Sequence, residues 1–312
     1  MQASQTARSN PLRTSPRLRT IVSFTLIMLT LAVMWESYKW MGQTTGGFWP
    51  GTNIGLPVRT NNRAMPHLWD IGAALFRPAR SGADQEILLA TLLKAGLFTL
   101  RSAFTGFVVG SAFGFSIAIW FIRSPLAERG LMPYVVASQT VPLIAIAPIV
   151  VIWGGKAGLP AWISVAIVSA YLSFFPVAIN ALRGLRSPPA TASELMRSYA
   201  ATPRETLTKL QIPAALPFLF PALKIAATAS VIGAIIGELP AGLSVGMGRA
   251  LLSFASSFSS APEKLFGAVL IAALLGLAFV GIVALLERRL IPPTRRVANE
   301  ADVSGVSLAG AR

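Results

Sequence analysis

The chain lacks cysteine and is poor in charge. Of its 312 residues, only 12% are charged and 54% are hydrophobic, and its mean hydropathy is +0.62. Soluble domains carry about 25% charged residues, so this chain has too little charge to cover a water-exposed surface. The absence of cysteine excludes disulfides and cysteine-ligated metals, and the single histidine, His67, excludes a site built from several histidines. The composition instead requires lipid as the solvent for much of the apolar surface.

Six apolar runs predict an all-α, polytopic membrane protein with about six transmembrane helices. The predicted spans are 21–35, 103–122, 131–153, 161–179, 214–237 and 265–286. Behind the first run, Trp35, Tyr38 and Trp40 form an aromatic belt typical of a membrane interface. No small-residue cleavage pattern follows, so we expect 21–41 to be an uncleaved anchor helix.

The basic residues predict the orientation. The segments 1–20, 123–129, 183–209 and 287–312 together hold 16 Lys and Arg, whereas seven lie in the segments of the opposite side. Because cytoplasmic loops carry an excess of Lys and Arg, we expect both termini in the cytoplasm. Since these charges lie between apolar runs, they fit an oriented protein in contact with membrane lipid and not a nucleic-acid groove.

This orientation divides the chain into five predicted parts. They are a cytoplasmic tail at 1–20, the anchor helix at 21–41, an outer loop at 42–85, a core at 86–290 that includes a cytoplasmic loop at 180–213, and a second cytoplasmic tail at 291–312.

The cytoplasmic loop carries two capping-box patterns, Thr191 with Glu194 and Thr202 with Glu205. In such a box, the hydroxyl and the carboxylate each satisfy a free backbone N–H at the start of a helix. The patterns predict two short helices, at about 192–200 and 203–211, and Pro213 is expected to end the second one. The residues alone leave two interpretations open: a docking element for a partner protein, or an amphipathic linker lying on the membrane.

This loop resembles the "EAA" loop of ABC-transporter permease subunits, the binding-protein-dependent inner-membrane component family. The resemblance rests on Ser193-Glu194-Leu195-Met196-Arg197-Ser198-Tyr199-Ala200-Ala201-Thr202 and, further on, Leu210-Gln211-Ile212-Pro213. Glu194 matches the family Glu, Leu195 and Met196 replace its two Ala, and Ala200 replaces a Gly. The family Gly permits a left-handed turn between the two helices, and Ala200 makes that turn costlier.

The resemblance covers roughly residues 86–290. Within the family, the chain is similar in particular to the nitrate/sulfonate/taurine-type uptake subfamily, whose fold is like that of the methionine importer permease. Some relatives are assigned to riboflavin or to pyrimidine-type compounds, and 237–242 is similar to that branch. The resemblance implies residues that couple to an ATPase: Glu194, Leu195, Met196, Ala200, Ala201, Ile212 and Pro213.

The resemblance also implies the partners and the mechanism. A permease homodimer, or a pair with a paralogous permease, forms the path in the cell inner (plasma) membrane. Cytoplasmic ATP-binding subunits drive it, and a periplasmic solute-binding protein delivers a small solute, so the loop at 42–85 is expected to be periplasmic. The chain has no phosphate-binding Gly-x-x-x-x-Gly-Lys-Ser/Thr pattern, so the energy must come from a partner. We expect no cofactor, no metal and no enzymatic activity of its own.

Four residues are candidates for lining the path: Gln139, Thr140, Pro142 and Glu238. Pro142 and Pro148 break the third predicted span, and proline frees backbone carbonyls that are tolerated only in protein or beside a wet cavity. The alternatives are a structural kink at the prolines and an interfacial carboxylate at Glu238.

Three further features are expected to be structural. Gly106, Gly110 and Gly114 repeat on one helix face and predict close helix packing within the permease. Lys224 is expected to anchor its span at the cytoplasmic interface, and His67 to be a surface residue.

Two other classes of membrane protein fit the sequence less well. An intramembrane enzyme lacks both a base near any membrane serine and a set of metal ligands. A stand-alone secondary transporter or channel remains the alternative, although such carriers usually show several intramembrane acids or an inverted repeat, which this sequence lacks.

Overall fold

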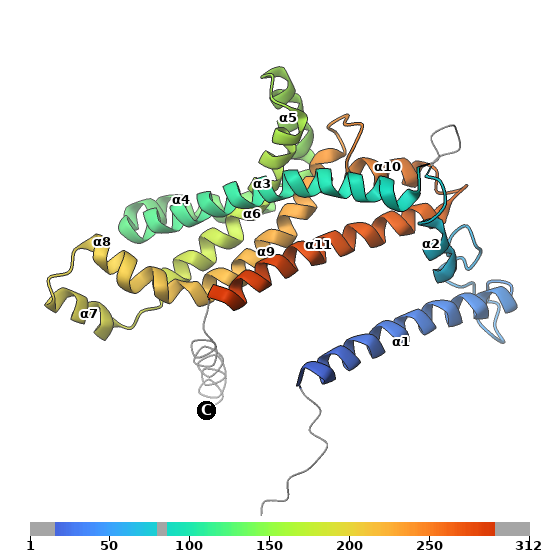
Figure 1. Ribbon diagram of the computed structural model, residues 1–312, viewed down its shortest axis with the longest axis horizontal. Helices are drawn as coiled ribbons and strands as arrows, with labels where there is room; N and C mark the ends of the chain where they lie inside the picture. Colours follow the sequence, from blue (N-terminus) through green and yellow to red (C-terminus); the bar gives the residue numbers. More distant parts are fainter. Residues whose placement is uncertain (1–15, 80–85, 291–312) are drawn as a thin grey trace, which may run out of the picture.

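A computed structural model describes residues 16–79 and 86–290, and these residues are almost entirely helical (Figure 1). The elements are α1 (Pro16–Thr44), α2 (Leu68–Ala74), α3 (Leu88–Arg123), α4 (Pro125–Ala137), η1 (Ser138–Thr140), α5 (Leu143–Lys156), α6 (Ala161–Leu185), α7 (Ala190–Ser198), α8 (Pro203–Glu205), η2 (Thr206–Gln211), α9 (Ile212–Glu238), α10 (Met247–Ser256) and α11 (Pro262–Leu290). The all-α, polytopic class predicted from the sequence is confirmed.

Among the described residues, five helices are long and apolar enough to cross a membrane, and a sixth span is formed if one bent pair is counted. The bent pair is α4 with η1, followed by α5, and the two parts meet at 98°. The third predicted span is therefore not one straight helix. The break lies at Pro142, which precedes α5 in an extended conformation, whereas Pro148 lies inside α5 without ending it.

The core of the bundle is formed by α3, α6 and α9. The predicted glycine stripe of α3 faces α6, and a Cβ added at Gly110 would lie 2.5 Å from the carbonyl oxygen of Ala170. On α9, a Cβ at Gly233 would lie 2.9 Å from Cα of Ser169. Ser169 also donates a hydrogen bond of 2.7 Å to the carbonyl of Ser230, so backbones and hydroxyls join the three helices. The prediction that the stripe serves packing within the chain is confirmed.

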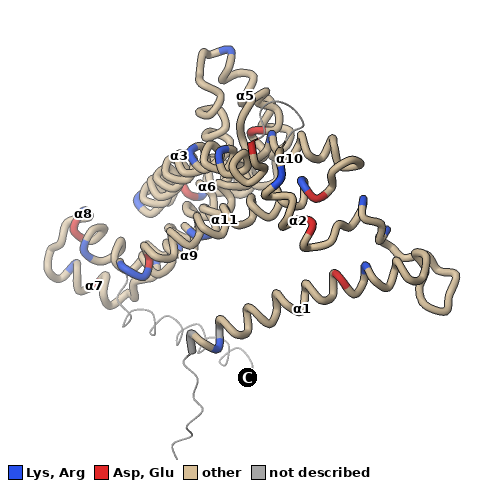
Figure 2. The backbone as a smooth tube through the Cα atoms, turned by 45° about the vertical axis from the view of Figure 1, so that its right-hand side comes forward, with Lys and Arg blue, Asp and Glu red and all other residues tan. Residues whose placement is uncertain are grey.

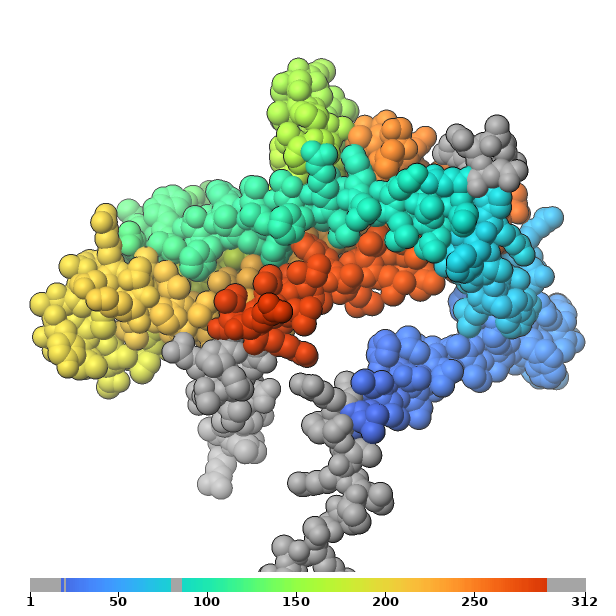
Figure 3. All heavy atoms as spheres, viewed as in Figure 1, coloured from blue at the N-terminus to red at the C-terminus, as the bar shows by residue number. Residues whose placement is uncertain are grey.

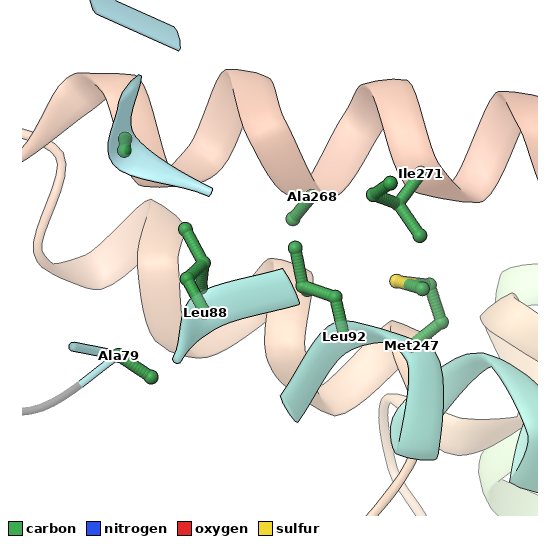
Figure 4. Packing of buried hydrophobic residues seen from close by; sticks show 7 residues of the cluster. Ala79, Leu88, Leu92, Met247, Ala268 and Ile271 are labelled. Carbon is green, nitrogen blue, oxygen red and sulfur yellow. The ribbon is translucent and has the colours of Figure 1, made fainter. Parts of the chain in front are cut away.

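A second cluster closes the opposite end of the bundle from the α7–α8 loop. Leu88 and Leu92 at the start of α3 meet Met247 of α10 and Ile271 of α11 (Figure 4). All four side chains are buried. The cluster fixes α10, a helix that the sequence did not predict within its Gly- and Ser-rich segment.

Helix α1 stands apart from this bundle. Its apolar side chains are exposed along most of its length, and Phe24 and Val33 are each 62% exposed. Figure 3 shows open space between α1 (blue) and α11 (red). Its C-terminal third is attached to the described part of the chain, where Trp35 contacts the ring of Phe266 and donates a hydrogen bond to the carbonyl of Pro66.

Candidate functional site

The candidate site is the loop that joins α6 to α9. It forms a hairpin of α7 and α8 with η2, and the hairpin projects from one end of the bundle (Figure 1). The first predicted capping box is wrong: α7 begins at Ala190, one residue before Thr191, and no side chain caps it. Pro189 is extended and starts the helix early, so the Thr191 hydroxyl lies inside the first turn and not ahead of it.

The second capping box is confirmed. The backbone N–H of Glu205 donates to Thr202 Oγ1 at 3.3 Å, and the backbone N–H of Thr202 donates to Glu205 Oε2 at 2.9 Å. Lys209 adds an ion pair of 2.9 Å to the same carboxylate. The start of the second helix is therefore held by local groups of the kind that sequence patterns detect.

The turn between the two helices has left-handed backbone geometry at Ala200, with φ of +52°. The N–H of Ala201 donates to the carbonyl of Met196, and the N–H of Ala200 donates to the carbonyl of Arg197. This is the Schellman arrangement, which usually has glycine at the left-handed position. The left-handed turn that the family forms with glycine is thus present here with alanine. The alanine methyl group makes this conformation less favourable by about 1–2 kcal/mol.

The hairpin presents part of the predicted coupling set to its surroundings. Glu194 is exposed, Leu195 is 55% exposed and Ala200 is exposed, whereas Met196, Ala201, Ile212 and Pro213 are half-buried. Tyr199 is 76% exposed and was not in the predicted set. Its position one helical turn after Leu195 is the signal that could have found it.

The hairpin is anchored to the bundle through Leu207, which sequence reasoning also missed. This side chain is buried in a cluster with Phe121 of α3, Leu182 and Leu185 of α6, and Ala215 of α9. Arg186 at the end of α6 makes a bidentate ion pair with Glu128 of α4, one arm of which measures 2.7 Å. The hairpin is therefore packed directly on the ends of the core helices.

The second helix of the hairpin does not end at Pro213. Residues Pro203–Glu238 form one helix of 36 residues, here called the coupling rod, which contains α8, η2 and α9. The predicted stop is wrong because Pro213 lies in the first turn of α9, directly after the π-helical η2, where a missing N–H costs little. At 1.5 Å per residue the rod is about 54 Å long, which exceeds the hydrocarbon core of about 30 Å. Lys224, partway along the rod, pairs with Glu287 of α11 at 2.5 Å.

At the far end of the rod, Glu238 is fully buried. Its Oε2 accepts a hydrogen bond of 2.7 Å from the N–H of Gly248 in α10. A Cβ added at Gly246 would lie 2.7 Å from this carboxylate, and one at Gly248 would lie 2.2 Å from the carbonyl of Ile235. Glycine at both positions lets the start of α10 close over the carboxylate, so Glu238 ties the rod to α10.

The other three predicted path residues lie elsewhere. Gln139, Thr140 and Pro142 are exposed on the elbow between α4 and α5. The hydroxyl of Tyr171 on α6 donates to the carbonyl of Ser138 and holds this elbow in place. Since Glu238 has no exposed surface in the single chain, the four residues do not meet in one site here, and their role in the path stays a prediction.

His67 is half-buried and has a partner. Its Nδ1 lies 2.8 Å from Glu36 Oε2, and the other oxygen of Glu36 accepts from the N–H of Leu68 at 2.9 Å. Glu36 thereby joins α1 to the start of α2, which is a structural role.

Comparison with known proteins identifies the class. The family described as the inner membrane component of binding-protein-dependent transport systems matches residues 110–292, more than half of the chain. The chain therefore belongs to this family. It is a multi-pass membrane permease subunit of an ABC importer, which moves a small solute delivered by a binding protein and is driven by ATP hydrolysis on partner subunits.

Individual relatives agree with this assignment. The chain is 31% identical to the formylaminopyrimidine transport permease protein ThiX of Halalkalibacterium halodurans, over 72% of this chain and 90% of that protein. It is also 31% identical to the riboflavin transport system permease protein RibX of Chloroflexus aurantiacus, over 78% and 90%. It is 30% identical to the putative aliphatic sulfonates transport permease protein SsuC of Bacillus subtilis, over 66% and 73%.

A solved structure of another transporter shares the fold. The crystal structure of an amino acid ABC transporter with histidines superposes with a TM-score of 0.52, covering 65% of this chain and 95% of that chain at 20% sequence identity. At this identity the likeness establishes the fold alone, and it agrees with the all-α, polytopic arrangement.

Proposed function

We propose that the α7–α8 hairpin is the surface through which this permease receives the work of its ATPase. The observation that carries this proposal is the contrast within the hairpin: Leu195 and Tyr199 are exposed beside Glu194, while Leu207 is buried among the core helices. Large apolar side chains exposed outside the bundle are typical of an interaction site. The buried anchor makes the hairpin a lever and not a loose linker.

The coupling rod provides the route from the ATPase to the opposite membrane surface. A push on the hairpin acts on the start of the rod at Thr202 and Glu205, and Glu238 at its other end holds α10 through Gly248. In this mechanism, closure of the ATPases on ATP moves the rod, and the rod moves α10. The ion pair between Lys224 and Glu287 makes α11 follow the rod.

Co-purification with a charge-reversal pair tests the proposal. Glu194→Lys is expected to abolish uptake and retention of the ATPase subunits while leaving the amount of protein in the membrane unchanged. Glu263→Lys is the matched control, because it makes the same charge change in the first turn of α11, outside the hairpin.

Normal uptake by the Glu194→Lys protein contradicts the coupling role. A wild-type chain that is stable and transports solute without any ATPase subunit supports a stand-alone secondary transporter or channel. Equal loss of uptake in both variants also counts against a specific role of the hairpin.

We propose that the protein lies in the inner membrane with both termini in the cytoplasm. The segments rich in Lys and Arg, which include the hairpin, all fall on the same side of the membrane in the predicted topology, and such segments are usually cytoplasmic. Figure 2 marks Lys and Arg on α7, α8 and the start of the coupling rod. Protease treatment of sealed inside-out vesicles is expected to cut the hairpin, and right-side-out vesicles to protect it. The parts 1–20, 21–41, 42–85, 86–290 and 291–312 remain the proposed division of the chain.

We expect two permease subunits in the assembly, either two copies of this chain or this chain with a paralogue. The elbow residues Gln139, Thr140 and Pro142 are exposed on a chain whose α5 projects at 98° from α4. We propose that this elbow faces the second subunit and lines the path between them. Cross-linking of a cysteine placed at Thr140 in an otherwise cysteine-free chain tests this arrangement.

The proposed solute is a small heterocycle of the pyrimidine or flavin type, with nitrate, sulfonate or taurine-like anions as the alternative. Support comes from the names of the two relatives that match 90% of their own length. An uptake assay decides between these solutes. It measures labelled riboflavin, formylaminopyrimidine, nitrate and taurine in the presence of the periplasmic binding protein that serves this permease. No enzymatic activity of this chain is proposed, in line with relatives that are transport permeases.

A further inference from the structure

A cavity of about 780 Å³ lies between the end of α3 and the hairpin. Three arginines line it, one from each neighbouring element: Arg123 ends α3, Arg197 lies on α7 and Arg204 lies on α8. Its wall also contains the apolar side chains of Ile122 and Leu207. Three guanidinium groups around one concave surface favour a ligand that carries negative charge.

The charge of this cavity is not balanced by the chain. No acidic side chain lines it, and among the described residues three acids of this end of the molecule are paired elsewhere: Glu128 with Arg186, Glu205 with Lys209 and Glu287 with Lys224. A fourth acid, Glu194, is exposed on α7 and lines no part of the cavity. None of the three cavity arginines takes part in an ion pair that the structure describes. Arginine remains charged at any physiological pH, so the cavity keeps its positive charge.

An apolar pocket of about 500 Å³ begins one helical turn away on the same helix. Trp120 and Phe113 of α3 line it together with Leu131 of α4 and Phe174 of α6. Trp120 and Arg123 are three residues apart, so they share one face of α3 and lie about 4.5 Å apart along its axis. A cavity lined by three arginines and an apolar pocket therefore follow each other along α3.

We propose that these two features form a binding site for one anionic phospholipid. Its phosphate lies among Arg123, Arg197 and Arg204, and its acyl chain lies against Trp120 and Phe113. The site rests on the proposed orientation, which places the end of α3 at the cytoplasmic headgroup level, where anionic lipids attract basic clusters. A bound lipid joins α3 to both helices of the hairpin, so it stabilises the hairpin in one position relative to the bundle.

Native mass spectrometry of the full chain with its ATPase tests this site. The complex is released from nanodiscs that contain equal amounts of phosphatidylglycerol and phosphatidylcholine. The wild type is expected to retain one phosphatidylglycerol per chain, and Arg123→Gln to reduce its retention about fivefold, the effect of one basic residue near the surface. Arg129→Gln is the matched control, because Arg129 is an exposed basic residue of α4 outside the cavity.

Two further measurements identify the source of the phosphate. Trp120→Ala is expected to lower phosphatidylglycerol retention while the thermal unfolding temperature stays near that of Arg129→Gln. Inorganic phosphate added at tens of millimolar is expected to displace little of the lipid. Displacement by inorganic phosphate together with full retention in Trp120→Ala overturns the lipid proposal in favour of a free anion.

Equal retention of phosphatidylglycerol in the wild type, Arg123→Gln and Arg129→Gln overturns the proposal, as does equal retention of the two lipids by the wild type. If Arg123→Gln fails to fold, Trp120→Ala alone decides. Complexes that keep the ATPase but show no preference for phosphatidylglycerol refute only the lipid site. Chains that keep the lipid but never bind an ATPase refute only the proposed function.

Discussion

Helices α1 and α6 are both apolar enough to span a membrane, but they differ in how much of their surface is buried within the chain. None of the most apolar 18-residue window of α1 is buried in the chain, whereas 44% of the corresponding window of α6 is buried. The two helices have similar hydropathy. Hydropathy therefore decides which segments enter the membrane, and another property decides which of them pack together.

That property is the presence of small residues on one face. Helix α6 packs against the face of α3 that carries Gly106, Gly110 and Gly114. A Cβ added at any of these glycines would lie less than 3 Å from a backbone carbonyl oxygen of α6. Helix α1 has only one glycine, Gly42 near its C-terminal end, and there a Cβ would lie 2.3 Å from Thr60 of the following loop. In lipid, apolar side chains gain nothing by leaving the acyl chains, so close backbone approach is what drives association.

The largest expected loss of stability comes from filling the glycine face of α3, the feature that α1 lacks. Gly110→Leu places its side chain into the carbonyl of Ala170, and overpacking at a backbone contact is expected to destabilise the bundle by about 3 kcal/mol or more. Ser23→Leu, on the exposed part of α1, is expected to leave stability within about 0.5 kcal/mol of the wild type. Thermal unfolding in detergent, followed by tryptophan fluorescence, measures both.

Equal unfolding temperatures for these two variants contradict the comparison. A larger loss in Ser23→Leu indicates that α1 packs within the chain, and a loss confined to the two-subunit assembly indicates a partner surface on α1.

A glycine pair outside α3 gives a second, smaller difference. Gly248→Ala brings a methyl group within 2.2 Å of the Ile235 carbonyl and disturbs the site where Glu238 holds α10, so a loss of about 2 kcal/mol is expected. Gly276→Ala, in α11, meets nothing within 4 Å and is expected to be neutral or to stabilise by up to about 1 kcal/mol. Thermal unfolding of the two variants measures this difference: the midpoint of Gly248→Ala is expected to fall, and that of Gly276→Ala to stay the same or rise. An equal fall in both variants contradicts the packing argument.

The hairpin, like α1, lies outside the bundle, and its turn offers a stabilising change. Ala200→Gly relieves the left-handed conformation at φ of +52° and is expected to stabilise the hairpin by about 1 kcal/mol. Hydrogen exchange of residues 190–205 should slow, with uptake retained. Ala192→Gly, within α7, is the control and is expected to speed exchange, because glycine weakens a regular helix. Faster exchange in Ala200→Gly excludes the strained turn.

The smallest effect is expected where α1 is attached. Trp35→Phe keeps an aromatic ring against Phe266 but removes the hydrogen bond to the Pro66 carbonyl, a loss of about 1 kcal/mol. Hydrogen exchange should rise in residues 58–68 and stay unchanged in α3 and α6. Increased exchange across the bundle means that α1 supports the core, which contradicts its separation.

Part of the proposed coupling site could be predicted from the sequence. The Thr202–Glu205 box and the left-handed turn at Ala200 depend on groups within five residues of each other; the box was predictable from its residues, and the turn from the family resemblance. The failure at Thr191 has a local cause as well, since Pro189 starts α7 one residue early. The continuous helix through Pro213 was not predictable, because the π-helical η2 that precedes it changes the register in which the proline falls.

The sequence by itself determined the lipid-embedded class, the apolar spans, the glycine stripe and the hairpin, because hydropathy, small-residue spacing and capping act over a few residues. Only the tertiary structure decided that α1 stands apart, that α4 and α5 meet at 98°, that Glu238 is buried under α10, and that three arginines surround one cavity. These features bring together residues far apart in the chain, and their geometry depends on which helix faces meet. Such meetings are set by packing across the whole bundle, which no local pattern records.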